Sequence, residues 1–186
     1  MAAPVIDATM PPWAAGEGMV ILGVDPGLNA TGYGVVAVEG SAYRVIDAGA
    51  ICPPRRQLLP ERLDDLRRGL VDVISRHRPA IMVLEMVFTH HRYPATAALM
   101  AHARGVACVT AQEHGLTVAE YPPARVKQAV TGNGNASKVQ VARMVAQWLG
   151  ALDPDLSLDA TDALALAVAH AHMDGQKRQL PAGTVR

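Results

Sequence analysis

The chain has 186 residues, which is enough for one well-buried domain and short for two. Half of the residues are apolar and only 4% are aromatic, so the core must consist mainly of Ala, Val, Leu, Ile and Met. The 17 basic residues equal the 17 acidic ones, and the overall charge therefore gives no hint of a nucleic-acid partner. No apolar run is long enough to cross a membrane, and residues 1–18 lack the pattern of a secretion signal. We therefore expect a cytoplasmic protein, and a reducing compartment with two buried thiols suits Cys52 and Cys108 better than the alternative, a disulfide between them.

After residue 18 the chain alternates strand patterns with helical ones. Three strands separated by turn residues come first, followed by a helix, a fully apolar strand, an Ala-rich helix and a fifth strand. A short helix, a Gly/Asn loop and two longer helices follow. The expected ranges are strands at 20–26, 32–39, 43–52, 81–85 and 116–120, and helices at 60–78, 95–114, 124–130, 137–149 and 158–173. This order predicts an α/β fold whose sheet begins with a meander.

The stretch from Val20 to Val36 is the most informative part of the chain. A short apolar run ends in Asp25, a turn rich in Gly and Asn follows, and a second apolar run begins. This pattern predicts a strand, a tight turn and an antiparallel partner. A carboxylate where a strand becomes buried is unfavourable unless it is paired, and a divalent cation pairs with it when other acids converge. Alternatively, Asp25 caps its own turn.

Three further acids lie in similarly apolar settings. Glu85 ends another apolar strand, and Asp159 and Asp162 share one face at the start of the last expected helix. Four carboxylates from two strands and a helix predict an oxygen-lined site for Mg²⁺ or Mn²⁺. Two such ions about 4 Å apart can activate a water and stabilise the leaving oxygen in phosphodiester cleavage. Helix capping is the structural alternative, and it explains Asp159 better than Asp162, because the residues that follow are almost wholly apolar.

Basic residues gather in the second half of the chain. Residues 89–147 contain six basic residues, two acids and four histidines. The basic residues and histidines are Arg92, Arg104, Arg125, Lys127, Lys138, Arg143, His90, His91, His102 and His114. A basic segment beside buried acids is typical of a metal enzyme that binds phosphate, although a solvated helical face gives the same pattern.

Several of these residues belong to motifs of a known family. The motifs are, in chain order, Gly23–Gly27, Thr31–Val35, Leu84–Phe88, Ala103–Ala107, Val126–Val130 with Gly132, Lys138–Gln140 and Asp159–Ala165. Each motif is weak alone, but the ordered set, from about Val20 to His172, resembles the RuvC family of Holliday-junction resolvases. The resemblance implies a ribonuclease H-like fold with a five-stranded mixed sheet flanked by helices, at 19–174. We expect flexible segments at 1–18 and 175–186.

The resemblance also implies an activity. Family members are homodimers that resolve four-way DNA junctions by symmetric paired nicking in recombination and DNA repair. They require Mg²⁺, expected here as two ions for which Mn²⁺ can substitute, and a RuvA–RuvB branch-migration complex is the implied partner. On this resemblance the catalytic acids and metal ligands are Asp25, Glu85, Asp159 and Asp162. Lys127 and Lys138 fall on basic residues near the scissile backbone, and Phe88 falls on an aromatic that stacks on a base.

The chain departs from the family pattern in three places. The loop 89–94 reads THHRYP where relatives usually carry a Lys-Asn pair, Met86 replaces a usual Gln, and residues 1–18 have no counterpart. The family's DNA contacts in this loop therefore do not transfer directly. We expect the DNA-contacting residues beyond the two lysines and Phe88 to be His90, His91, Arg92, Arg104 and Arg125.

Three other functions share parts of this pattern. The Asp25-x-Gly27-x4-Gly32 spacing also occurs in actin-like ATPases and sugar kinases, but these need a second similar domain, for which the chain is too short. A generic ribonuclease H-like nuclease acting on RNA or on DNA ends is closer. A non-catalytic junction-binding module belongs to a different class, and it would not need four acids near phosphates that they repel.

Overall fold

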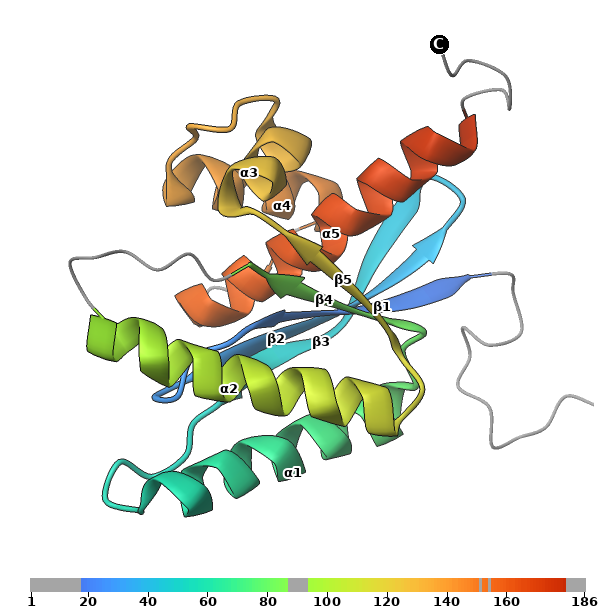
Figure 1. Cartoon of the computed structure of the whole chain (residues 1–186). Coiled ribbons are helices and arrows are strands. Elements are labelled where there is room, and N and C mark those ends of the chain that lie inside the picture. The colour runs from blue at the N-terminus through green and yellow to red at the C-terminus, as the bar shows by residue number, and fades with distance from the viewer. Residues whose placement is uncertain (1–17, 87–93, 151, 154, 180–186) are drawn as a thin grey trace, which may run out of the picture.

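Five strands form one mixed sheet in the order β3-β2-β1-β4-β5 (Figure 1). The computed structural model describes residues 18–86, 94–150, 152–153 and 155–179. The meander runs antiparallel through β1 (Met19–Asp25), β2 (Thr31–Glu39) and β3 (Ala42–Ile51). The sheet continues from β1 with two parallel strands, β4 (Ile81–Glu85) and β5 (Thr117–Tyr121).

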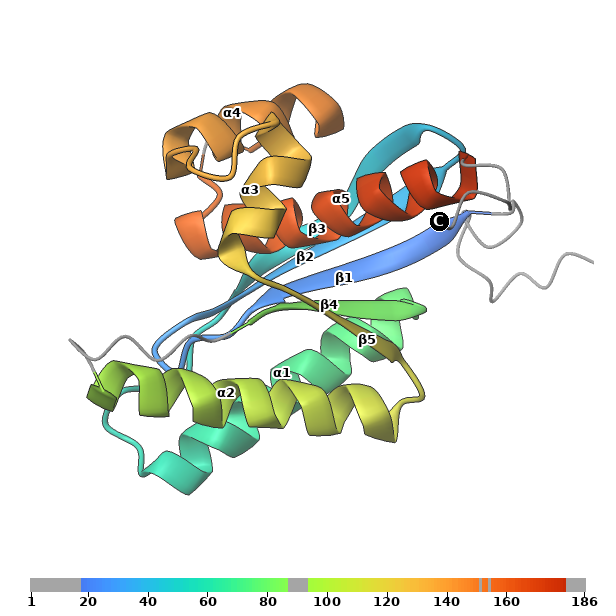
Figure 2. The same cartoon turned by 45° about the horizontal axis from the view of Figure 1, so that its top comes forward.

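Helices cover both faces of the sheet (Figure 2). One face is covered by α1 (Leu59–His77) and α2 (Pro94–Glu113). The other is covered by α5 (Leu158–Gln179), with α3 (Pro123–Thr131) and α4 (Lys138–Leu149) packed on that helix. None of the helices in the described ranges is both long and apolar enough for a membrane span.

The alternation of side chains along the strands separates two apolar cores. Leu22 and Val35 point to the face of α1 and α2, whereas Ile21 and Val36 point to the face of α5. All four side chains are fully buried. Because β1 is covered on both faces, it reads as a continuous apolar run up to its terminal acid.

The expected five-stranded mixed sheet flanked by helices is confirmed, and each expected helix and strand is present. The main difference lies at the last helix, which continues to Gln179 instead of ending near 173. A single glycine, Gly175, does not stop a helix, and the next proline comes only at Pro181.

Three glycines let α5 lie directly on β1 and β2. Gly23 and Gly34 are paired across the two strands, and Gly32 is paired with Asp25. A Cβ atom at Gly23 would lie 2.0 Å from the carbonyl oxygen of Ala163, and one at Gly32 would lie 2.0 Å from that of Asp159. No residue with a side chain fits at either position without moving the helix. The glycines therefore set the distance between the start of α5 and the strand that carries Asp25.

Candidate active site at the strand ends

Asp25 and Glu85 come together because β1 and β4 are parallel neighbours. Val24 pairs with Leu84, so the next residue on each strand is the acid. Both strands end at these acids, at the same edge of the sheet. Asp162 reaches the same place from the second turn of α5, the helix that packs against the three glycines of β1 and β2.

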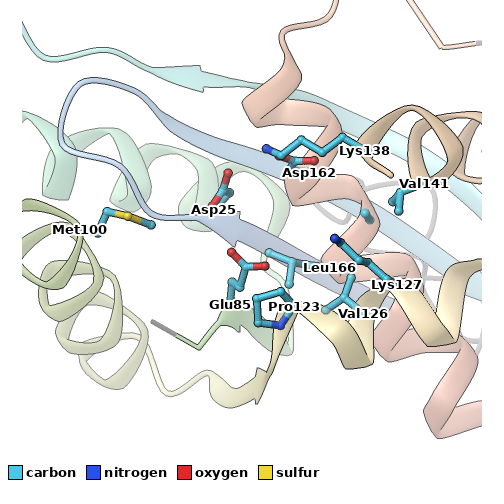
Figure 3. Close-up of a pocket in the computed structure, with 11 residues that line it drawn as sticks. Asp25, Glu85, Met100, Pro123, Val126, Lys127, Lys138, Val141, Asp162 and Leu166 are labelled. Carbon is cyan, nitrogen blue, oxygen red and sulfur yellow. The ribbon is translucent and has the colours of Figure 1, made fainter. Parts of the chain in front are cut away.

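These three carboxylates line a cavity of about 330 Å³ (Figure 3). Lys127 on α3 and Lys138 at the start of α4 line it as well. The remaining wall is apolar and consists of Met100, Pro123, Val126, Val141, Ala165 and Leu166. The cavity therefore combines acids, two cations and an apolar wall drawn from both layers of helices.

The carboxylates repel one another in this setting. Burial, together with the negative charges of Glu85 and Asp162, raises the pKa of Asp25 to about 7, although Lys138 acts in the opposite direction. Burial and the charge of Asp162 also raise the pKa of Glu85. The nearby lysines thus do not fully compensate the negative charge of the acids. A bound cation would stabilise their ionised forms and lower their pKa values.

The lysines hold separate positions at the cavity. The Lys138 ammonium donates a hydrogen bond to Asp162 Oδ2 at 2.6 Å, and this bond raises the pKa of Lys138. Its place is defined locally, because Ser137 caps α4 and forms a capping box with Gln140. Lys127 reaches the cavity from α3, and its charge lowers the pKa of Glu85.

Oxygen-only donors fit a hard divalent cation such as Mg²⁺. Within the described ranges, however, no group of three or more His, Cys, Asp or Glu side chains is close enough to hold a single ion. Mg²⁺ is usually held by one or two carboxylates and completes its shell with waters and phosphate oxygens. Asp25, Glu85 and Asp162 therefore fit such an ion by their chemistry without forming a closed cage.

The structure places the fourth acid differently. Asp159 does not line the cavity, and its backbone carbonyl instead packs over Gly32. Its charge is still close enough to raise the pKa of Asp25, although less than Glu85 and Asp162 do. The sequence motif therefore brings three of its four acids to the cavity wall and leaves the fourth nearby.

Apart from Lys127 and Lys138, which line the cavity, the predicted DNA-contacting residues fall into two groups. Phe88, His90, His91 and Arg92 lie outside the described residues. Arg104, on α2, forms an ion pair with Glu120 of β5, and Arg125 is exposed on α3; neither lines the cavity.

Sequence reasoning did not identify the apolar wall of the cavity. Helical spacing could have found part of it, because Val141 follows Lys138 by three residues and Leu166 follows Asp162 by four. Met100 carries no such signal, because it comes from the helix layer on the opposite face of the sheet.

Comparison with known proteins connects the chain with one family. The chain matches the family model described as crossover junction endodeoxyribonuclease RuvC over residues 21–170. It is 47% identical over 152 residues to the protein of that name from Halorhodospira halophila, covering 82% of this chain and 89% of the relative. The Rhodopirellula baltica protein of the same name is 42% identical over 153 residues, covering 82% of this chain and 86% of the relative.

Solved structures agree with this result. The structure described as T. thermophilus RuvC in complex with a Holliday junction substrate matches with a TM-score of 0.79 and 33% identity, over 86% of this chain and 96% of that one. The yeast mitochondrial Holliday junction resolvase Ydc2 matches with a TM-score of 0.60 and 12% identity, which shows a shared fold alone. The expected ribonuclease H-like fold is therefore confirmed. The chain carries the family's motifs in order, shares the fold of a solved RuvC structure and is 47% identical to one relative over 82% of its own length. The chain therefore belongs to the RuvC family.

Proposed function

We propose that this protein resolves four-way DNA junctions in recombination and DNA repair, by paired, metal-dependent hydrolysis of phosphodiesters. The main support is that three carboxylates and two lysines, from five different helices and strands, line one cavity. Such a set can hold a divalent cation and a phosphodiester together. Membership of a family whose members are named crossover junction endodeoxyribonucleases supports the choice of reaction and substrate.

The metal that we propose is Mg²⁺, as two ions per chain, with Mn²⁺ as a substitute. When bound, it lowers the pKa of a water and stabilises charge on the leaving oxygen. Asp25, Glu85 and Asp162 would hold it, and Asp159, whose charge reaches Asp25, is proposed as the fourth acid. Lys127 and Lys138 supply positive charge for the phosphate oxygens, where charge develops during cleavage.

Two symmetric nicks require two active sites, so we propose a homodimer. The chain contains one set of acids, and a two-fold axis supplies the second. The Ala-rich sequence at 95–111, with Ala97, Ala98, Met100, Ala101 and Ala107, predicts a dimer interface, although the same pattern also suits packing on the chain's own sheet. That set is wrong in part: Ala107 is fully buried against the chain's own core, and Met100 lines the catalytic cavity.

The outward face of α2 remains as the proposed dimer surface. Ala98, Ala101, Gly105 and Val109 lie along this face, and all four are exposed. Small residues at this spacing let two helices approach closely. We further propose that the dimer acts in the cytoplasm with the RuvA–RuvB branch-migration complex, for which family membership is the support.

A substrate panel tests the proposed function. The purified protein is incubated with Mg²⁺ and end-labelled four-way junction, linear duplex of the same sequence, or RNA–DNA hybrid. We expect paired nicks in two strands of like polarity in the junction and little cleavage of the other two substrates. Preferred cleavage of the hybrid would identify a generic ribonuclease H-like nuclease. Tight junction binding without cleavage at any Mg²⁺ or Mn²⁺ concentration would identify a binding module.

A further inference from the structure

A second cavity of about 310 Å³ lies beyond α4 from the catalytic cavity. It is formed by the end of α3, the loop between α3 and α4, and one face of α4 (the helices are labelled in Figure 2). The lining residues are Thr131, Asn133, Ala136, Gln140, Arg143, Met144 and Gln147. None of them is acidic, and no residue lines both cavities.

Helix α4 presents different side chains to the two cavities. Lys138 and Val141 line the catalytic cavity, whereas Gln140 and Arg143 line the second one. Arg143 follows Lys138 by about 140° around the helix axis and about 8 Å along it. The second cavity is therefore separate from the catalytic one but within a few nucleotides of it, because a DNA strand rises 3.4 Å per nucleotide.

The hydrogen bonds of the loop leave this cavity rich in donors. Asn133 Oδ1 accepts from the Asn135 backbone at 3.0 Å, and Gln140 Oε1 accepts from the Ser137 backbone at 2.8 Å. Each oxygen thus has one lone pair engaged by a backbone N–H group, and the NH₂ groups of both amides form no hydrogen bond with a described residue. Arg143 lines the same cavity. It forms no hydrogen bond or ion pair with any described residue, so its five N–H donors are available to a ligand.

The loop that carries these donors is held in place by side chains. Gln128 donates to Gly132 O at 2.8 Å and accepts from the Gly134 backbone at 3.0 Å. Thr131 Oγ1 donates to Lys127 O at 2.8 Å and accepts from the Asn133 backbone N–H at 3.1 Å. The rim of the cavity is thus organised before a ligand arrives, which lowers the entropy lost on binding.

Charge favours an anionic ligand. Residues 122–150 contain no Asp or Glu but four basic residues, namely Arg125, Lys127, Lys138 and Arg143. Three arginines of α1 differ, because Arg67, Arg68 and Arg76 each pair with an aspartate of the same helix. Arg143 keeps its full charge available to a partner from outside the chain.

We propose that the second cavity is a phosphodiester-binding subsite, anchored by Arg143, for the DNA strand that leaves the catalytic cavity over the start of α4. This assignment rests on the proposed function, because it takes junction DNA as the ligand. A guanidinium with neighbouring amide donors matches the oxygens of a phosphodiester in geometry and charge. The subsite holds a phosphate within a few nucleotides of the scissile one and takes no part in the chemical step.

The test compares Arg143→Gln with Arg44→Gln, a control that removes the same charge from an exposed position of β3 that lines neither cavity. Affinity for a fluorescent four-way junction is measured by anisotropy in EDTA over a range of KCl concentrations. We expect Arg143→Gln to weaken binding about three- to tenfold and to reduce the slope of log K against log[salt] by about 0.9. Arg44→Gln should match the unmodified protein, and Arg143→Lys should restore the slope.

A second measurement locates the phosphate. Neutral methylphosphonates replace the phosphates of the junction one at a time. One replacement, within a few nucleotides of the scissile position, should weaken binding of the unmodified protein but not of Arg143→Gln. The single-turnover nicking rate at saturating protein and Mg²⁺ should be the same for both proteins.

The outcomes separate the two proposals. If the unmodified protein binds and nicks junctions while Arg143→Gln has the same affinity and salt slope, the subsite is refuted and the proposed function stands. Equal weakening by Arg44→Gln, or the absence of any phosphate that depends on Arg143, also overturns the subsite. If the unmodified protein neither binds nor nicks junctions, the proposed function itself fails.

Discussion

Asp25 and Gly32 are paired directly across β1 and β2, and the backbone of Asp159 lies over Gly32. The residue that supplies the carboxylate and the residue that admits the helix are thus neighbours in one ladder. This relationship explains how Asp162, which lies three residues beyond Asp159 on α5, comes to line the same cavity as Asp25. One methyl group added at Gly32 would therefore displace the helix that carries Asp162.

Gly32→Ala should therefore damage both stability and catalysis. The added Cβ would lie 2.0 Å from the Asp159 carbonyl oxygen, so α5 must move away from the sheet. We expect a loss of about 1–3 kcal/mol in the free energy of unfolding. Junction nicking, measured well below the melting temperature, should fall at least about tenfold.

Gly175→Ala is the matched control. Gly175 lies on α5, and a Cβ atom there would meet nothing within 4 Å. This change should add about 0.5–1 kcal/mol of stability and leave nicking unaltered. Normal nicking by folded Gly32→Ala would contradict the role given to the glycines.

The raised pKa of Asp25 predicts how stability depends on pH in the absence of metal. Its pKa is about 7 in the folded state against 3.8 in the unfolded one, so the folded state binds the proton more tightly. This contribution to stability is fully present below about pH 4 and is lost as the pH rises to 7. Asp25→Asn should thus stabilise the metal-free protein at pH 8, by up to a few kcal/mol.

Thermal unfolding in EDTA at pH 8, 7, 6 and 5 checks this prediction. The advantage of Asp25→Asn should shrink steadily as the pH falls. Glu113→Gln, at an exposed position at the end of α2, serves as the control for removing one charge. An advantage that is constant with pH would show that the cause is not the ionisation of Asp25.

The carboxylates are predicted to be essential for cleavage but not for binding. Asp25→Asn and Glu85→Gln keep the side-chain shape and remove the charge that would hold a metal ion. Nicking should collapse, while junction affinity in EDTA is retained or increases, because carboxylates repel phosphates. Nicking by Asp25→Asn at the normal rate would refute the acid cluster as the metal site.

Lys127 and Lys138 should affect the rate more than the affinity. A cation beside a developing oxyanion contributes roughly 3 kcal/mol, so replacement of either lysine by Ala should lower single-turnover cleavage about a hundredfold. Junction affinity should fall much less, because each lysine is one phosphate contact among many. Equal losses in rate and affinity would make them ordinary contacts to the DNA backbone.

The dimer is tested on the outward face of α2. The side chain of Val109 is 56% exposed, so Val109→Glu introduces a charge there without disturbing the core. Light scattering coupled to gel filtration at micromolar concentration should give twice the chain mass for the unmodified protein and the chain mass for the variant. Paired nicking should be lost with the dimer, and a monomeric protein that still makes paired nicks would contradict the two-fold arrangement.

The amino-acid sequence alone was sufficient to predict the strands, the helices and the acids at the strand ends. Apolar runs and helical spacing are properties of neighbouring residues, so they indicate burial without knowledge of the fold. Asp25 and Glu85 could be predicted to be close, because each ends an apolar strand. The ordered motifs added the topology, which local patterns do not contain.

Tertiary structure decided which side chains meet. The three-residue spacing of Asp159 and Asp162 is the same in any helix, but the packing of α5 on Gly32 and Gly23 places only Asp162 in the cavity wall. Which face of α2 is free depends likewise on packing, and this packing buries Ala107. The donors of the second cavity depend on hydrogen bonds within the loop and the first turn of α4, because these bonds orient the amides of Asn133 and Gln140. Such contacts depend on the relative positions of distant segments, which spacing along the chain does not determine.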